Sequence, residues 1–217
     1  MDHDASVRSV EVTSSTAAEA RVTGLVFILS GPSGVGKDAI RAQLQAESFP
    51  ITFCVTATSR APRPGEIDGV HYRFLQLDDF DRMESTGELL EHALVHGRHY
   101  GVPIQEVRDG LAAGRDVFIT VDVQGGETVR RKLSRAITIF LAPPSLDALL
   151  PRLASRGTED EAERAIRLAT AAKEMERMCF YDYVVVNEQG RLLEAVEKVK
   201  AIIIAERCRV QPSLVEL

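Results

Sequence analysis

The stretch GLVFILSGPSGVGKDAIRAQLQAE, residues 24–47, constrains the fold more than any other part of the chain. Its first seven residues are a short apolar run with β-branched and aromatic members and predict a buried strand, while Ile40 and Leu44, spaced i, i+4, predict a helix over 37–47. Between them lies Gly31-x-x-x-x-Gly36-Lys37, where glycines let backbone N–H groups surround phosphate oxygens at a helix N-terminus. The stretch therefore predicts a strand, a phosphate-binding loop and a helix, with Lys37 reaching the phosphates of a nucleotide.

Asp38 departs from the usual pattern of such a loop. This position normally carries Ser or Thr, whose hydroxyl ligates Mg²⁺. A carboxylate is also a good ligand for Mg²⁺, directly or through water, and negative charge is favoured in the first turn of a helix. We expect Asp38 to take the metal role, and the alternative is that it turns away and only stabilises the start of the helix.

The rest of the chain alternates apolar strands with helices. Strands are predicted at 51–59, 116–122, 136–144 and 181–189, and helices around 145–155, over 159–178 and over 192–207. Such alternation predicts an α/β fold of the P-loop NTPase type, a parallel sheet with helices on both faces. Asp122 ends the strand VFITVD, where a carboxylate near the metal is expected in this class.

Composition limits the other function classes. The chain has 217 residues and is 45% hydrophobic, which suits one domain with a sizeable core, and no apolar run is long enough to span a membrane. Residues 1–23 lack the layout of a signal peptide and, like residues 208–217, are expected to be a tail. Three scattered cysteines fit a reducing cytoplasm, and the net charge of −6 argues against nucleic acid as a partner.

The most specific stretch is TSRAPRPGEIDGVHYRF, residues 58–74. It resembles the guanylate kinase family, whose pattern of Thr, Ser or Thr, Arg, a basic residue, an acidic residue, Gly and Tyr-x-aromatic is met in order by Thr58, Ser59, Arg60, Arg63, Glu66, Gly69, Tyr72 and Phe74. The downstream segments GELLEHALVHGRHYGVP, VDVQGG, APPSLDALLPRLASRGTEDE and VVVN are similar to later parts of that family. The resemblance covers roughly residues 25–206.

The resemblance implies transfer of the γ-phosphoryl of ATP to GMP, and to dGMP, with Mg²⁺. The acceptor phosphate is already ionised near neutral pH, so the chemistry needs positioning and charge neutralisation rather than a general base. The implied catalytic residues are Lys37, Arg60, Arg156 and Arg167. ATP is expected at Gly31, Pro32, Ser33, Gly34, Val35, Gly36, Lys37, Asp38, Arg152 and Asn187, and the metal at Asp38 and Asp122.

The expected GMP site combines residues that bind the acceptor phosphate with a residue that recognises the guanine base. Glu91 is expected to accept hydrogen bonds from guanine N1–H and the 2-amino group together, whereas adenine offers neither donor. Glu66 is expected to hold an arginine in place, and Val102 replaces a family Ser or Thr beside the base, which removes one hydroxyl contact. The GMP-binding residues are Thr56, Arg60, Arg63, Glu66, Tyr72, Glu91, Tyr100, Val102 and Asp122.

The same resemblance divides the chain into parts. A guanylate kinase-like domain at 24–207 is expected to have a core of 24–58, 104–144 and 179–207, a GMP-binding subdomain at 59–103 and a helical lid at about 145–178. The expected assembly is a monomer or a homodimer. Two rival functions stay open: a ribose 1,5-bisphosphate phosphokinase-like enzyme, against which Glu91 argues, and an inactive guanylate-kinase-like binding module, against which the intact loop argues.

Overall fold

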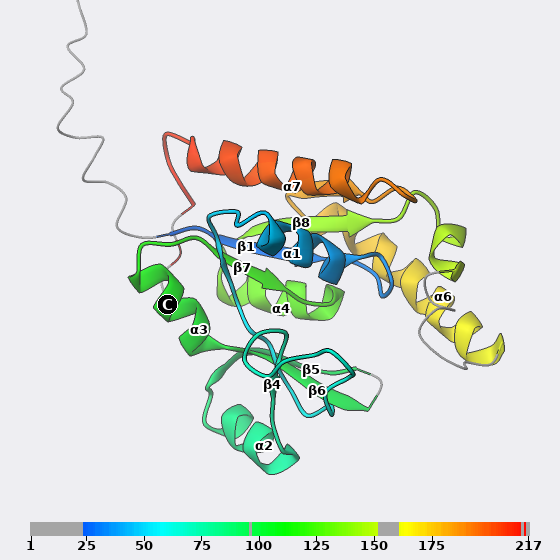
Figure 1. Cartoon of the computed structure of the whole chain (residues 1–217), viewed down its shortest axis with the longest axis horizontal. Helices are drawn as coiled ribbons and strands as arrows, with labels where there is room; N and C mark the ends of the chain where they lie inside the picture. Colours follow the sequence, from blue (N-terminus) through cyan, green and yellow to red (C-terminus); the bar gives the residue numbers. More distant parts are fainter. Residues whose placement is uncertain (1–23, 96, 152–160, 214, 216–217) are drawn as a thin grey trace, which may run out of the picture.

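A five-stranded parallel sheet organises the molecule, with strand order β2-β7-β1-β8-β9. The computed structural model describes residues 24–95, 97–151, 161–213 and 215, with the backbone alone over 161–165. Helices cover both faces of this sheet (Figure 1). The strands are β1 (Val26–Ser30), β2 (Thr52–Phe53), β7 (Val117–Thr120), β8 (Ile137–Ala142) and β9 (Tyr183–Val186). The predicted α/β fold class is confirmed.

Alternation along β1 supplies the two halves of the core. Phe27 and Leu29 are fully buried in a cluster with α1 (Lys37–Ala46) and α7 (Leu192–Arg207). Val26 and Ile28 are buried in a second cluster with α3 (Ile104–Ala112) and α4 (Val123–Lys132). Successive side chains of a strand point to opposite faces, so this central strand is apolar from Val26 to Leu29 because both of its faces are covered.

A second, smaller sheet lies below the first in Figure 1, with strand order β4-β3-β6-β5. Strands β5 and β6 form an antiparallel hairpin, and helix α2 buries Phe80 and Met83 in a cluster with Leu89 of β5. The elements are β3 (Ala57–Thr58), β4 (Arg73–Phe74), α2 (Leu77–Ser85), β5 (Leu89–Val95) and β6 (Arg98–Pro103).

The prediction of one strand over 51–59 was wrong. The backbone N–H of Cys54 makes the last bond to the main sheet, at Phe118 O, and the chain then crosses so that Thr58 pairs with Tyr100 in the second sheet. Small and β-branched residues suit both sheets, so the apolar pattern does not mark the crossing. Helices α2, α3 and α4 were also not predicted.

After β8 the chain forms η1 (Asp147–Leu149), α6 (Glu161–Glu176) and η2 (Arg177–Phe180). Of the expected lid, residues 152–160 lie outside the described part of the chain. The expectation of a tail over 208–217 is wrong at Val215, which is buried in the core cluster beside β1. Among the described residues, no helix is long and apolar enough to cross a membrane.

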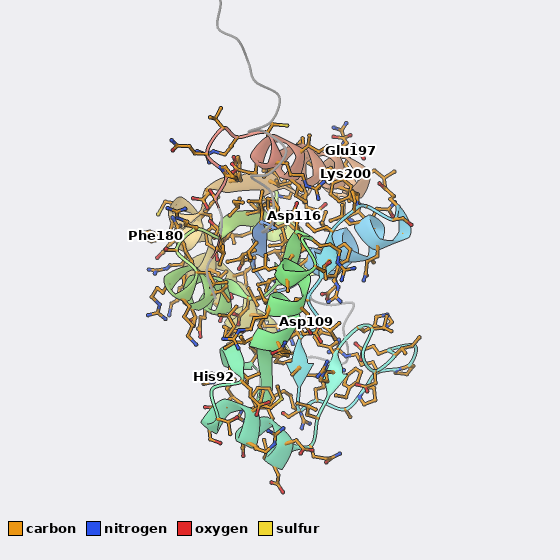
Figure 2. All side chains as sticks on the ribbon, turned by 90° about the vertical axis from the view of Figure 1, so that its left-hand side faces the viewer. His92, Asp109, Asp116, Phe180, Glu197 and Lys200 are labelled. Atoms are coloured by element: carbon orange, nitrogen blue, oxygen red, sulfur yellow. The ribbon has the colours of Figure 1, made fainter. Side chains whose placement is uncertain are left out.

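Asp116, labelled in Figure 2, links the end of the sheet at which its central strands begin to the last helix. Its carboxylate accepts hydrogen bonds from the backbone N–H of Leu25 at 2.8 Å and from Nε of Arg207 at 2.5 Å. This contact fixes the start of β1 relative to α7. The phosphate-binding loop lies at the opposite, carboxyl end of β1.

Candidate active site

The glycine-rich loop follows β1 directly and requires glycine at two positions. Gly31 has φ +143°, and a Cβ there would come within 2.2 Å of the carbonyl oxygen of Leu141 in the neighbouring strand. Gly36 is the N-cap of α1 with φ +105°. Lys37 Nζ donates to the carbonyl oxygens of Gly31 at 2.5 Å and Pro32 at 3.2 Å, so the lysine folds over its own loop.

Asn187 supports this loop from behind. Its side chain is 5% exposed, and its Nδ2 donates to the carbonyl oxygen of Val35 at 2.8 Å. A Cβ at Gly36 would come within 2.5 Å of the same Nδ2. The sequence resemblance placed Asn187 near adenine, whereas the structure places its amide against the loop backbone.

A pocket of about 350 Å³ opens in front of the loop. It is bounded by the loop with the start of α1, by the second sheet, by the end of β7 and by α6. Its lining includes the predicted residues Ser33, Gly34, Gly36, Lys37, Asp38, Thr56, Arg60, Arg63, Tyr72, Glu91, Tyr100, Asp122 and Arg167. The fold therefore brings residues that are far apart in the sequence, from Ser33 to Glu174, to one cavity.

Arg60 is held on several sides. Its two terminal nitrogens donate to the Glu66 carboxylate at 2.8 and 2.9 Å, and its Nε donates to the Tyr100 hydroxyl at 3.2 Å. The guanidinium also lies 5.2 Å from the centroid of the Tyr72 ring and 5.6 Å from that of Phe74. The hydrogen bonds to Glu66 raise the pKa of Arg60 further above its usual value. Arg60 is thus a fixed cation with little freedom to lose on binding an anion.

Glu66 organises the loop that carries both arginines. Besides Arg60, it accepts a hydrogen bond from the backbone N–H of Arg63 at 2.6 Å. The hydrogen bond from Arg60 lowers the pKa of the Glu66 carboxyl, which keeps it ionised. Glu66 itself does not line the pocket, while Arg63 does. A single carboxylate therefore sets the positions of two cationic residues.

The tyrosines Tyr72 and Tyr100 pack edge to face with ring centroids 6.0 Å apart. Burial raises the pKa of Tyr72 to about 12, so its hydroxyl remains a donor at neutral pH. Together with Arg60 and Arg63, they give this side of the pocket donors and positive charge, which suits a phosphate.

Glu91 lies deep in the pocket on β5 and is 3% exposed. Burial, and then the charge of Asp122, raise the pKa of Glu91 to about 8. Asp122 is the N-cap of α4 and accepts the backbone N–H of Gly125 at 2.7 Å. A Cβ at Gly125 would come within 2.8 Å of Glu91 Oε1. The glycine thus leaves room for the carboxylate.

Of the expected site residues that the structure describes, the pocket lining lacks Gly31, Pro32, Val35, Glu66, Val102 and Asn187. Val102 pairs with Glu91 in register across the hairpin, but its side chain is fully buried in the core cluster with Val107 and Leu111. An apolar side chain gains burial there, so the expected place beside the base is not the one it takes. Arg152 and Arg156 lie outside the described residues.

Sequence reasoning missed several pocket residues. Arg41 lies one helical turn after Lys37, and that spacing was the available signal for it. Thr120 precedes the predicted Asp122 by two residues. Nothing local distinguished Thr170 and Glu174 on α6 from other polar helix residues. The unpredicted lining residues include Arg41, Thr120, Gln124, Thr170 and Glu174.

The parallel sheet, the loop at the end of β1 and the cationic pocket facing it define a nucleotide-phosphate-binding protein of the P-loop class. The family model described as Guanylate kinase matches residues 24–206. The chain belongs to the guanylate kinase family.

Individual relatives agree along most of the chain. It is 47% identical to guanylate kinase 2, chloroplastic/mitochondrial, of Oryza sativa subsp. japonica, over 89% of this chain and 68% of that protein. It is 43% identical to a guanylate kinase of Desulfitobacterium hafniense, over 87% of this chain and 93% of that protein. The crystal structure of guanylate kinase from Anaplasma phagocytophilum matches with a TM-score of 0.69 at 30% identity, covering 89% and 90% of the two chains.

Proposed function

We propose that this protein transfers the γ-phosphoryl group of ATP to GMP, giving ADP and GDP, and that it accepts dGMP as well. The observation that carries the proposal is that the buried Glu91 and the held Arg60 line the same pocket as the phosphate loop. One cavity thus offers groups for a purine base, an acceptor phosphate and a donor phosphate. The relatives named guanylate kinase support the same activity. Such a reaction belongs to purine nucleotide metabolism, where it recycles GMP, and the scattered cysteines support a cytoplasmic setting.

The acceptor phosphate is assigned to Arg60, Arg63, Tyr72 and Tyr100. A phosphate monoester is largely dianionic near neutral pH, and its own oxygen is the nucleophile. The task of these residues is therefore to neutralise charge and hold the oxygen in line with the donor phosphorus. Because Arg60 is already held by Glu66, its position for binding the phosphate is set before the substrate binds.

The base is assigned to Glu91. As a carboxylate it accepts both the N1–H and the 2-amino donors of guanine, and a ribose phosphate without a base gives it nothing to bind. Binding of GMP must favour the ionised form of the Glu91 carboxyl group, because burial favours the protonated form in the free protein. The match of the carboxylate to two donors supplies that free energy.

The donor triphosphate is assigned to the loop, with Lys37 and Arg167 as the cations facing the transferred group. Asp38 and Asp122 both line the pocket with hard carboxylate oxygens, the type of ligand that Mg²⁺ prefers, so these residues fit the ion. When bound with ATP, Mg²⁺ supplies neutralisation of phosphate charge. The alternative of an inactive binding module would lead us to expect a chain without a working phosphate loop. The intact loop of this chain argues against that alternative.

The experiment that tests the function is a coupled ATP-consumption assay run in parallel with GMP, dGMP, AMP and ribose 1,5-bisphosphate. We expect rapid turnover with GMP, lower turnover with dGMP, and little with AMP or the sugar phosphate. Preference for ribose 1,5-bisphosphate would contradict the proposal. Absence of turnover with all four, in a protein that still binds GMP, would favour the binding module.

A further inference from the structure

Arg41 lines the pocket but is not among the residues assigned to the base, the acceptor phosphate or the donor triphosphate. It lies one helical turn after Lys37 on α1, and both side chains line the cavity. The side chain of Arg41 is half-buried, and its guanidinium lies 5.9 Å from the centroid of the Phe53 ring. Arg41 therefore brings a positive charge to the wall of the pocket near the phosphate loop.

A backbone carbonyl orients this guanidinium toward the acceptor side of the pocket. Nη2 of Arg41 donates to the carbonyl oxygen of Val70 at 3.1 Å, which joins α1 to the segment between β3 and β4. Val70 lies in a tight turn, in which the backbone N–H of Gly69 donates to the carbonyl oxygen of Tyr72 at 2.8 Å. The hydrogen bond therefore holds Arg41 at the turn that carries Tyr72, one of the residues assigned to the acceptor phosphate.

The charge of Arg41 is not balanced by an ion pair within the described residues. Arg60 is paired with the carboxylate of Glu66, whereas the described hydrogen bond of Arg41 goes to a neutral carbonyl. Burial lowers the pKa of Arg41, and the charges of Asp38 and Glu106 offset this effect only in part. A partly buried cation that faces a nucleotide pocket without a paired carboxylate suits an anionic ligand.

We propose that Arg41 is a further binding residue for the acceptor phosphate of GMP, in addition to Arg60, Arg63 and the two tyrosines. The inference rests on the proposed function, which supplies GMP as the acceptor. A guanidinium carries several N–H donors in one fixed plane, so the hydrogen bond to Val70 leaves others to reach phosphate oxygens. The Val70 carbonyl thus orients the guanidinium, and the phosphate is its negatively charged partner.

Titration calorimetry with GMP, with guanosine and with ATP, each in the absence of the others, tests the proposal. The proteins are the parent chain, Arg41→Met, Arg41→Lys and the control Arg73→Met, which removes the same charge beside the same turn but outside the pocket lining. We expect Arg41→Met to bind GMP about 10- to 100-fold more weakly than the parent, the cost of a charge-assisted hydrogen bond, and to bind guanosine and ATP like the parent. Arg41→Lys keeps the charge without the planar group and should recover part of the GMP affinity, and the control should bind like the parent.

Three results would overturn the proposal. Equal losses for GMP and guanosine would do so, because guanosine has no phosphate, and a loss confined to ATP would place Arg41 at the donor phosphates instead. Salt dependence gives the third: the GMP affinity of the parent should fall more steeply with KCl concentration than that of Arg41→Met, since one cation fewer meets the phosphate. Equal affinities and equal slopes would leave Arg41 as a brace of the turn. If Arg41→Met does not fold, Arg41→Lys decides, and a GMP affinity equal to that of the parent contradicts the inference.

Failure of this inference can be told apart from failure of the proposed function. A parent chain that phosphorylates GMP, with the same GMP affinity in Arg41→Met, fails only the role of Arg41. A parent chain that does not bind GMP fails the assignment of the acceptor. Titration with inorganic phosphate in the presence of ADP then still tests Arg41, because a phosphate in this pocket should bind more weakly to Arg41→Met than to Arg73→Met, and equal affinities would overturn the inference.

Discussion

The guanidinium of Arg60 and the carboxylate of Glu66 meet through two hydrogen bonds, of 2.8 and 2.9 Å, with the two side chains only 11% and 17% exposed. Such a bidentate pair fixes the plane of the guanidinium as well as its position. The nitrogen Nε is fixed separately by Tyr100. Arg60 is therefore oriented before any substrate binds, and Glu66 acts on the pocket through it.

The first prediction concerns this pair. In Glu66→Gln, the guanidinium of Arg60 loses the negatively charged partner that fixes its position. We therefore expect kcat/KM for GMP to fall on the order of 10- to 100-fold while KM for ATP stays unchanged. Steady-state kinetics with each substrate varied in turn measures this. Glu106→Gln is the matched control, because it breaks the ion pair with Arg73, which is half exposed and outside the pocket lining. An equal loss in both variants would show that Glu66 has no special role.

The second prediction concerns Lys37. We expect Lys37→Ala to lower kcat about 100- to 1000-fold, the cost of removing one donor aimed at developing charge, while the protein stays folded. Loss of the bonds to Gly31 and Pro32 is a minor structural effect, since glycines and Asn187 also shape the loop. Circular dichroism and the coupled assay check both statements, with the exposed Lys198→Ala as control. Near-normal turnover in folded Lys37→Ala would remove the lysine from the mechanism.

The third prediction is that Glu91 sets the base preference. The amide in Glu91→Gln has only one acceptor oxygen, and its NH₂ group would face a hydrogen-bond donor of guanine. We therefore expect GMP affinity to fall far more than ATP affinity. The pKa of about 8 adds a pH effect, because binding uses the ionised form: GMP affinity of the parent should increase from pH 6 to pH 8. Titration calorimetry of both nucleotides measures this. Equal losses for ATP and GMP would contradict the assignment.

The fourth prediction is that the raised pKa of Glu91 makes the free energy of unfolding depend on pH. Folding raises the pKa of Glu91 from its ordinary value to about 8, so the folded state holds a proton that the unfolded state releases between those two pH values. The free energy of unfolding therefore decreases as pH rises through this window. Glu91→Gln carries no such proton, so its stability advantage over the parent should grow from pH 5 to pH 8, to on the order of 3 kcal/mol. Urea unfolding across this range checks it, with exposed Glu188→Gln as the control. A constant difference would contradict the prediction.

Features encoded within a few neighbouring residues could be predicted from the sequence. The spacing from Gly31 to Lys37 and the arginine-rich stretch around Arg60 carry their own chemistry, and the structure brings both to one pocket. The crossing between the sheets after Cys54 was not predictable, because the same side chains are compatible with either sheet. Glu174 lines the same pocket as the loop although the two are far apart in the chain, and no local pattern distinguishes that residue from its exposed neighbour Glu176.

The last prediction concerns Asp38, the acidic residue of the loop. It lies in the first turn of α1 and lines the pocket, and its charge acts on both Tyr72 and Arg41. The carboxylate therefore faces the site, where two anions about 5 Å apart repel by roughly 3 kcal/mol at an effective dielectric constant near 20. Mg²⁺ at this position would convert the repulsion into a ligand bond.

We expect Asp38→Ser to bind metal-free ATP more tightly than the parent and to shift the Mg²⁺ dependence of ATP binding, because the added gain from the metal shrinks when the carboxylate is gone. The comparison is Asp78→Ser, which removes an exposed carboxylate from the first turn of α2 and so carries only the helix-start effect of about 0.3–1 kcal/mol. Titrating ATP with and without Mg²⁺ into the three proteins gives both quantities. If the metal-free affinities and the Mg²⁺ curves of Asp38→Ser coincide with those of the parent, and its loss of stability equals that of Asp78→Ser, Asp38 is a helix-start residue and the metal at this loop is held without it.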